Sequence, residues 1–251
     1  MRRHACLLVA FLGYASAALA AEVETERMTS PEIRAAVAAG KTTIIIPTGG
    51  TEQNGAHMVT GKHNFIVRET ARRIAERLGN ALVAPVIAYV PEGDIRRREG
   101  HMAFPGSISV PPDVFAKLLE AAAASFAAHG FKLIVFLGDS GLNQAPQQQL
   151  AAALTGRWAG DGVRVLNATD YYAHNGGVAW LKAQGETEAA IGTHAGIADT
   201  SELLAIFPDG VRPDKVAAGH AGTSGDPARA TPKRGQKLID LKVAAAVREI
   251  E

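Results

Sequence analysis

Four apolar runs divide the chain into a regular series. They cover residues 42–47, 81–90, 131–137 and 163–166. Runs of this length, bounded by glycine, proline or polar residues, predict strands. Their nearly unbroken apolar character is typical of strands that are covered on both faces.

Helical spacing of apolar positions separates these runs. In residues 64–78, Ile66 and Ile74 lie on one helix face, and Gly79 ends the pattern. Comparable helices are expected at 30–40, 113–129, 145–159 and 236–249. Alternating strands and helices predict an α/β fold, with a mostly parallel sheet and helices on both faces. The glycine- and proline-rich segment just before the last helix is expected to be an extended surface segment.

The first 20 residues predict a cleaved signal peptide. Arg2 and Arg3 precede an apolar stretch, 6–18, and residues 18–20 (ALA) form a small-x-small cleavage site. The apolar stretch is too short to span a membrane. We therefore expect export to a bacterial periplasm or to the medium, and a single α/β domain over residues 21–251.

Composition narrows the range of partners. Removal of the leader leaves 24 basic and 25 acidic residues, and it takes away Cys6, the only cysteine. A near-neutral chain argues against nucleic acid or a membrane surface as the main partner. An exported protein of this size without disulfides must depend on its apolar core.

The loop after the first predicted strand carries the densest group of chemically active side chains. Residues 48–57 (TGGTEQNGAH) contain Glu52 and His57, and His63 follows soon after. Ligand and catalytic groups gather at the carboxyl ends of strands in α/β proteins. A carboxylate with imidazoles predicts a site for zinc, manganese or a similar divalent ion. The alternative is a hydrogen-bonded loop with surface histidines.

A second polar turn, residues 138–143 (GDSGLN), follows the third predicted strand. We expect Asp139 or Ser140 to lie beside the first loop and to take part in catalysis. The alternative is a tight glycine turn with Asn143 as a helix cap. A nucleophile elbow is not favoured, because it needs glycine two residues after Ser140 and Leu142 stands there.

A third group, His194 and Asp199, lies in residues 193–201 (THAGIADTS) before a predicted helix. The histidine can serve as a general acid or base, and the aspartate as a further ion ligand. The alternative is a simple helix cap formed by the hydroxyl residues that follow. His101, on the long loop 91–112, is a weaker candidate that either lines the pocket or is an ordinary loop histidine.

Taken in order, these segments resemble the motifs of the creatininase family. The matching stretches are 49–58 (GGTEQNGAHM), 101–107 (HMAFPGS), 138–143 (GDSGLN), 194–201 (HAGIADTS) and 225–231 (GDPARAT). The resemblance implies a Rossmann-like, three-layer α/β sandwich and hydrolysis of a C–N bond. It also implies a divalent metal centre, usually of two ions, and a homo-oligomer, often a hexamer.

The resemblance also assigns individual residues. Glu52 matches a family metal ligand, and His194 matches the histidine proposed to act in catalysis. Asp199 replaces a glutamate and keeps the carboxylate. Three ligand positions differ in residue type: Asn54, His63 and Ser140. The first and third replace histidines and are poor zinc ligands, whereas the second replaces an aspartate with another ligand type. The site is therefore either rebuilt or without metal.

These patterns predict an exported, divergent creatininase-like amidohydrolase that acts on a small amide, cyclic amides included. One or two ions of zinc or manganese would be held by Glu52, His57, His63 and Asp199. His194 would carry a proton to the leaving nitrogen, with Asp139 and Ser140 as further catalytic candidates. The rival prediction is a non-catalytic periplasmic protein that binds a small molecule and has lost the metal. A third is a metal-free hydrolase that uses Ser140.

Overall fold

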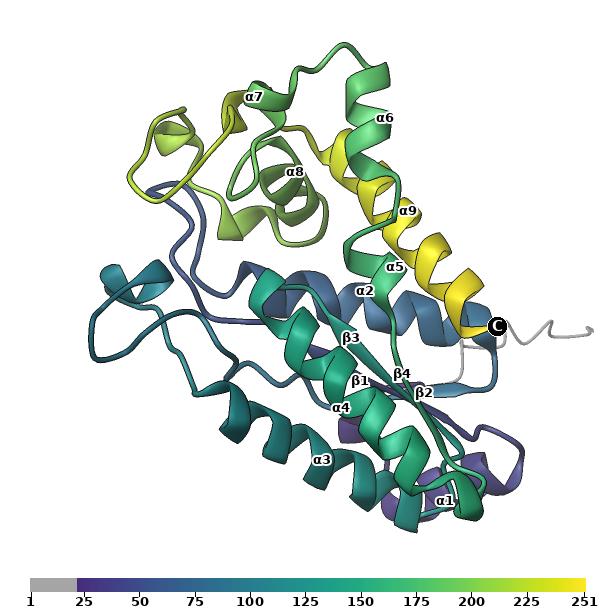
Figure 1. The fold of residues 1–251 in the computed structure, drawn as a ribbon. Helices are drawn as coiled ribbons and strands as arrows, with labels where there is room; N and C mark the ends of the chain where they lie inside the picture. The colour runs from purple at the N-terminus through teal and green to yellow at the C-terminus, as the bar shows by residue number, and fades with distance from the viewer. Residues whose placement is uncertain (1–21) are drawn as a thin grey trace, which may run out of the picture.

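A four-stranded sheet forms the centre of the computed structural model, which describes residues 22–251 (Figure 1). The strands are β1 (Thr43–Thr48), β2 (Ala81–Val83), β3 (Leu133–Gly138) and β4 (Arg164–Asn167). All neighbouring strands are parallel, in the order β2-β1-β3-β4. The predicted signal peptide, residues 1–20, lies outside the described residues.

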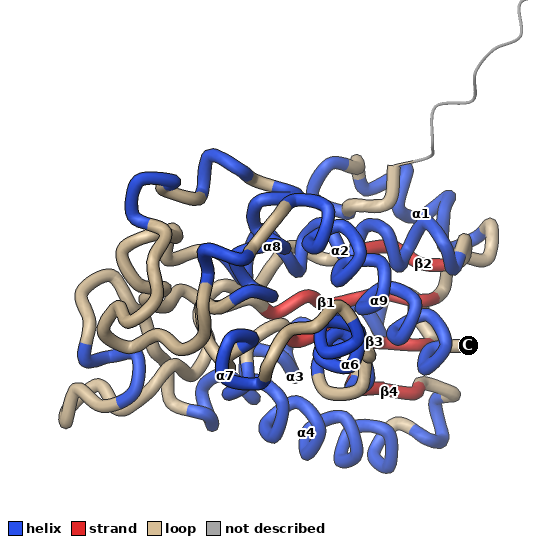
Figure 2. Tube along the Cα trace, turned by 90° about the horizontal axis from the view of Figure 1, so that it is seen from above, coloured by secondary structure: helices blue, strands red, loops and turns tan. Residues whose placement is uncertain are grey.

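Helices connect the strands and cover both faces of the sheet (Figure 2). The longer helices are α1 (Ser30–Ala38), α2 (Lys62–Leu78), α3 (Pro112–Ala128), α4 (Gln144–Arg157), α8 (Ile197–Ile206) and α9 (Pro232–Ile250). The shorter ones are α5 (Thr169–Tyr172), α6 (Gly177–Ala183) and α7 (Glu188–Ile191). The predicted α/β class is confirmed. Within residues 22–251, no helix combines the length and the apolar character needed to cross a bilayer.

Alternate residues of β1 supply two separate apolar cores. Ile45 packs with buried side chains of α2 and α9 on one face of the sheet. Ile44 and Ile46 pack with α3 and α4 on the other face. Because successive strand residues point to opposite faces, a strand covered on both faces is mostly apolar, as residues 44–47 of β1 are.

The second strand is much shorter than predicted. The expected strand over residues 81–90 ends at Val83. Pro85 follows closely and has no N–H to donate to a neighbouring strand, so regular pairing stops before it. Farther along the expected strand, Ile87 returns to the sheet, where its N–H donates to the carbonyl oxygen of Pro47 at 2.9 Å.

The segment before α9 is more ordered than the predicted extended surface segment. The helix begins at Pro232, earlier than the predicted residue 236, because Thr231 caps it by accepting a hydrogen bond from the N–H of Arg234. Further upstream, the carbonyl oxygen of Gly222 accepts a hydrogen bond from Gln53 Nε2 at 2.6 Å. This segment therefore reaches the loop that follows β1.

The strands β1 and β3 end side by side, with Thr48 paired to Gly138. Asn143 ties together the loops that follow them, since its Nδ2 donates to Thr48 Oγ1 and to the carbonyl oxygen of Gly49, each at 2.9 Å. The polar residues that follow the two strands are thus brought to one edge of the sheet.

Candidate functional site

A cavity of about 400 Å³ opens at this edge of the sheet. Its volume lies in the range of small-molecule sites, and its position at the carboxyl ends of parallel strands is where α/β proteins bind ligands. Titratable side chains in its lining include Glu52, Lys62, His63, Glu92, His101, Asp139, His194 and Asp199. Apolar side chains in its lining are Leu142, Val178, Ala198 and Leu238.

Glu52 stands at the centre of the titratable group. The loop holds its backbone, since its N–H donates to the carbonyl oxygen of Thr60 at 3.0 Å. Its Oε1 lies 2.9 Å from His63 Nε2, and its Oε2 lies 3.0 Å from His101 Nε2. Burial acts to raise the pKa of Glu52, but the charges of Lys62 and His63 outweigh it and hold that pKa well below its usual range. The carboxylate is therefore ionised.

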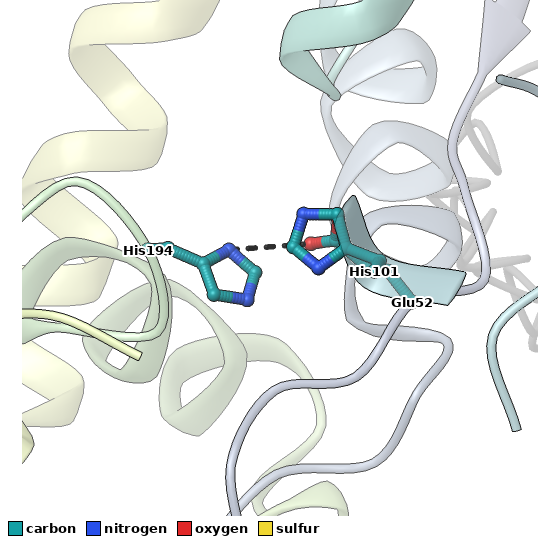
Figure 3. A group of neighbouring side chains, drawn as sticks. All are labelled: Glu52, His101 and His194. Atoms are coloured by element: carbon teal, nitrogen blue, oxygen red, sulfur yellow. Dashed lines mark ion pairs between the residues drawn. The ribbon is translucent and has the colours of Figure 1, made fainter. Parts of the chain in front are cut away.

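His101 and His194 form with Glu52 a group that fits one divalent ion (Figure 3). One ligand atom from each residue lies within 4.8 Å of the others. His194 Nε2 lies 2.9 Å from the carbonyl oxygen of Gln53, which can only accept, so this nitrogen carries the proton. Its Nδ1, 3.5 Å from Glu52 Oε1, therefore has the lone pair. Two imidazoles and a carboxylate form a known donor set for catalytic zinc.

Burial keeps both of these imidazoles neutral. It lowers the pKa of His194 to about 4, and the charge of Lys62 acts in the same direction. Burial also lowers the pKa of His101. Because neutral imidazole is the form that binds a metal, both rings already have the net charge that metal binding requires at neutral pH.

Lys62, the first residue of α2, lies between two of the predicted ion ligands. Its buried Nζ is 3.3 Å from Glu52 Oε1 and 2.5 Å from Asp199 Oδ2. Burial opposes its charge, but Asp199 and Glu52 together raise the pKa of Lys62. Asp199 Oδ2 also accepts a hydrogen bond from the N–H of Ala195 at 2.7 Å. Ala195 has a φ of 56°, an unusual backbone conformation of the kind that clusters at functional sites.

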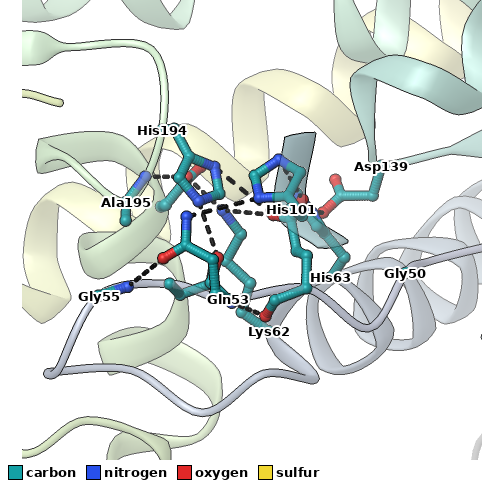
Figure 4. A network of polar contacts seen from close by, with 12 residues as sticks. Gly50, Gln53, Gly55, Lys62, His63, His101, Asp139, His194 and Ala195 are labelled. Atoms are coloured by element: carbon teal, nitrogen blue, oxygen red, sulfur yellow. Dashed lines mark hydrogen bonds and ion pairs between the residues drawn. The ribbon is translucent and has the colours of Figure 1, made fainter. Parts of the chain in front are cut away.

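His63 joins the loop after β1 to the turn after β3 (Figure 4). Its Nε2 lies 2.9 Å from Glu52 Oε1, and its Nδ1 lies 2.7 Å from Asp139 Oδ2. Burial and the charge of Lys62 lower its pKa, but the charge of Glu52 and the hydrogen bonds to both carboxylates raise the pKa of His63 overall to about 9. An imidazolium that donates from both nitrogens has no lone pair for a metal. The group of three close ligand atoms contains His101, Glu52 and His194, and the predicted ligand His63 lies beside it.

Asp139 is held from the side opposite His63. Its Oδ1 accepts hydrogen bonds from the Tyr171 hydroxyl at 2.6 Å and from Lys242 Nζ at 3.0 Å. Lys242 also donates to Glu202 Oε2 at 2.7 Å. Burial acts to raise the pKa of Asp139, but Lys242 and His63 lower it overall. In this position Asp139 orients His63.

Two other predicted site residues, Ser140 and His57, lack the contacts that their predicted roles require. Ser140 is buried and lines the cavity. Among residues 22–251, however, no histidine is hydrogen-bonded to its hydroxyl, so the activated pair of a serine hydrolase is absent there. His57 Nε2 lies 3.1 Å from Thr200 Oγ1, and its ring stacks on His220. The structure thus places His57 outside the group formed by the other site residues.

The sequence did not predict three buried titratable residues of the cavity: Lys62, Glu92 and Glu202. Burial and the neighbouring charge of Glu52 raise the pKa of Glu92 to about 9. Gly50 leaves room for it, because a Cβ atom there would lie 2.1 Å from Glu92 Oε1. The available signals were positional: Lys62 directly precedes His63, and Glu92 closely follows an apolar run.

A family model described as creatinine amidohydrolase matches residues 26–250. The chain belongs to the creatininase family. A creatinine amidohydrolase from Pseudomonas putida is 29% identical over 194 residues, which cover 75% of this chain and 74% of that protein. A mycofactocin precursor peptide peptidase from Mycolicibacterium smegmatis is 28% identical over 222 residues, which cover 78% of this chain and 79% of that protein. The predicted family is confirmed.

Solved creatininases share this fold. A creatininase variant in which a tryptophan is replaced by alanine gives a TM-score of 0.76 at 24% identity, covering 92% of this chain and 98% of that one. A manganese form of creatininase gives 0.74 at 24% identity with the same coverage. A zinc–zinc form of a creatininase variant gives 0.70 at 25% identity, covering 92% of this chain and 97% of that one. Family membership also confirms the predicted class, a hydrolase of non-peptide C–N bonds.

Proposed function

We propose that this creatininase-family chain hydrolyses the C–N bond of a small amide, cyclic or open-chain, and uses one divalent ion held by Glu52, His101 and His194. The observation that carries the proposal is the convergence of these three side chains in the cavity. Zinc and manganese are the proposed ions, because solved creatininases include forms with each and the donor set suits both.

The ion would polarise the amide carbonyl and lower the pKa of a bound water toward ~7. The chain's own residues prepare the site for that chemistry. His63 keeps the Glu52 carboxylate in place, since its Nε2 contacts Glu52 Oε1 at 2.9 Å. His194 is assigned to the ion instead of to proton transfer, because its other nitrogen is committed to the carbonyl oxygen of Gln53.

Asp199 is the residue that we assign to orient the substrate. Its Oδ2 is occupied by Lys62 and by the N–H of Ala195. Its side chain is 24% exposed and lines the cavity. The other carboxylate oxygen can therefore accept a hydrogen bond from a substrate N–H. Leu142 and Val178, both largely exposed in the cavity lining, would contact the apolar part of the substrate.

One observation favours the rival function, a non-catalytic binding protein. The Lys62 ammonium already neutralises charge between Glu52 and Asp199, two of the predicted ligands. Because Lys62 offsets the negative charge of these two carboxylates, the pocket does not need an ion for that purpose. It can then bind a small polar molecule without any ion.

Metal removal separates the two functions. The purified protein is stripped of metal, reloaded with zinc or manganese, and tested on small amides that include creatinine. The enzyme proposal expects hydrolysis that returns with metal and is lost in Glu52→Ala. Equal binding of small amides with and without metal, with no hydrolysis of any of them, would support the binding protein instead. A matched control is Glu69→Ala, which changes a half-buried glutamate of α2 outside the cavity lining.

We further propose that residues 1–20 are removed on export to the periplasm or the medium, and that the remaining single domain assembles into a homo-oligomer, by family analogy a hexamer. The basic start and the small-x-small site support the first proposal. N-terminal sequencing of the exported protein tests the cleavage, and light scattering tests the assembly. An intact N-terminus or a monomer would contradict the respective proposal.

A further inference from the structure

Lys62 occupies the space between two carboxylates that come from distant parts of the chain. It begins α2, whereas Glu52 lies in the loop after β1 and Asp199 lies in α8. Its side chain has no exposed surface. We propose that the Lys62 ammonium takes the place of a metal ion between Glu52 and Asp199, so that this chain binds no more than one divalent ion in its cavity.

Distances exclude joint occupancy of that position. Lys62 Nζ lies 2.5 Å from Asp199 Oδ2 and 3.3 Å from Glu52 Oε1. An ion bound to the same two oxygens would need bonds of ~2.0–2.2 Å to each, and it would overlap the ammonium. The ion assigned to Glu52, His101 and His194 shares only Glu52 with that position, and His101 contacts the other oxygen of Glu52, Oε2, at 3.0 Å.

Charge balance supports the same assignment. A buried carboxylate needs a cation or several hydrogen-bond donors. Here Lys62 contacts both Glu52 and Asp199, and Lys242 contacts Asp139. The two carboxylates that an ion at this position would bind are thus already paired with a cation of the chain.

The presence of an ammonium where an ion could bind has a chemical consequence. An ammonium supplies positive charge and N–H donors, but it has no coordination position for a water. Lys62 can therefore hold two carboxylates in place, but it cannot activate a nucleophile. If the proposed function is right, all water activation falls to the single ion at Glu52, His101 and His194. In this role Lys62 is a positioning residue.

The test compares metal stoichiometry in the wild type, Lys62→Ala and Lys62→Met. Each protein is stripped, dialysed against zinc or manganese and measured by native mass spectrometry and elemental analysis. We expect at most one ion in the wild type and one additional ion in Lys62→Ala, where the position of Nζ becomes open. Lys62→Met is the matched control, because it removes the charge but fills the space, and it should gain no ion.

Two ions in the wild type would overturn the inference, and this measurement needs no variant to fold. An unchanged count in folded Lys62→Ala, or an equal gain in Lys62→Met, would overturn it as well. The same measurements test the proposed function independently of this inference. A wild type without metal combined with one ion in Lys62→Ala would refute the proposed metal enzyme and still support the replacement of an ion by Lys62.

Discussion

His63 Nδ1 and Asp139 Oδ2 lie 2.7 Å apart and join α2 to the turn after β3. The other nitrogen of His63 contacts Glu52, and the other oxygen of Asp139 accepts from Tyr171 and Lys242. The orientation of the central carboxylate thus depends on groups that extend to α9, which carries Lys242. This arrangement leads to the following predictions.

Asp139→Asn should weaken metal binding although Asp139 is not in the proposed donor set. The neutral amide orients His63 less firmly, and loss of such a supporting group lowers metal affinity by about 10–100-fold. Titration of the stripped protein with zinc measures the effect. Asp170→Asn is the control, since Asp170 pairs with the exposed His174 on the surface. Unchanged affinity in Asp139→Asn would show that the contact is not needed for the site.

Histidine variants distinguish the donor set proposed from the structure from the one predicted from the sequence. His101→Ala and His194→Ala each remove a proposed ligand, so each should lower zinc affinity by more than the ~100-fold expected for a supporting group. His57→Ala should leave affinity nearly unchanged, because the His57 ring contacts Thr200 and His220. Isothermal titration of the three variants decides between the sets, and a larger loss in His57→Ala would favour the sequence-based one.

Tyr171→Phe should destabilise the fold. The variant removes a hydroxyl that donates to Asp139 at 2.6 Å and is hydrogen-bonded to Thr70 at 2.9 Å, all within the buried interior. A buried polar group that loses its partner destabilises by about 1–3 kcal/mol. Urea unfolding measures the loss, and Tyr89→Phe, at an exposed position, is the control. Equal stability of the two variants would contradict the buried network.

Glu202 should make stability depend on pH. Burial raises its pKa to about 7 even though Lys242 acts to lower it. A carboxyl with a raised pKa in the folded state stays protonated there while the unfolded chain ionises. Its contribution is therefore fully present below the unfolded pKa and is lost as pH rises through about 7.

Comparison of Glu202→Gln with the wild type isolates that contribution. The wild type should lose stability relative to the variant by up to about 1.4 kcal/mol per pH unit between the two pKa values. Urea unfolding from pH 5 to 8 gives the difference. A stability difference that stays constant over this range would show that Glu202 does not titrate as described.

Local patterns were sufficient to predict much of the fold and part of the site. Apolar runs locate the strands, and strand ends locate the loops of Glu52 and Asp139, which the pairing of Thr48 with Gly138 brings together. The extent of the second strand was predicted wrongly, because the sequence run stays apolar beyond Pro85 while the backbone loses a donor there.

The rest of the site depends on tertiary packing. His101 lies on a long loop whose path the local sequence does not determine, so its approach to Glu52 at 3.0 Å was not predictable. In the sequence alone, nothing distinguishes Lys62 from other polar residues near the start of a helix. Its burial follows only from the position of α8, which brings Asp199 to it.

Anomalous diffraction at the zinc edge, on crystals of the zinc-loaded protein, tests most directly whether the cavity holds one ion on Glu52, His101 and His194. We predict a single peak at ~2.0–2.2 Å from a Glu52 carboxylate oxygen and from one nitrogen of each of the two imidazoles. A peak between Glu52 and Asp199 with Lys62 displaced, a peak at His57, or an absence of zinc from the cavity would contradict the proposed centre.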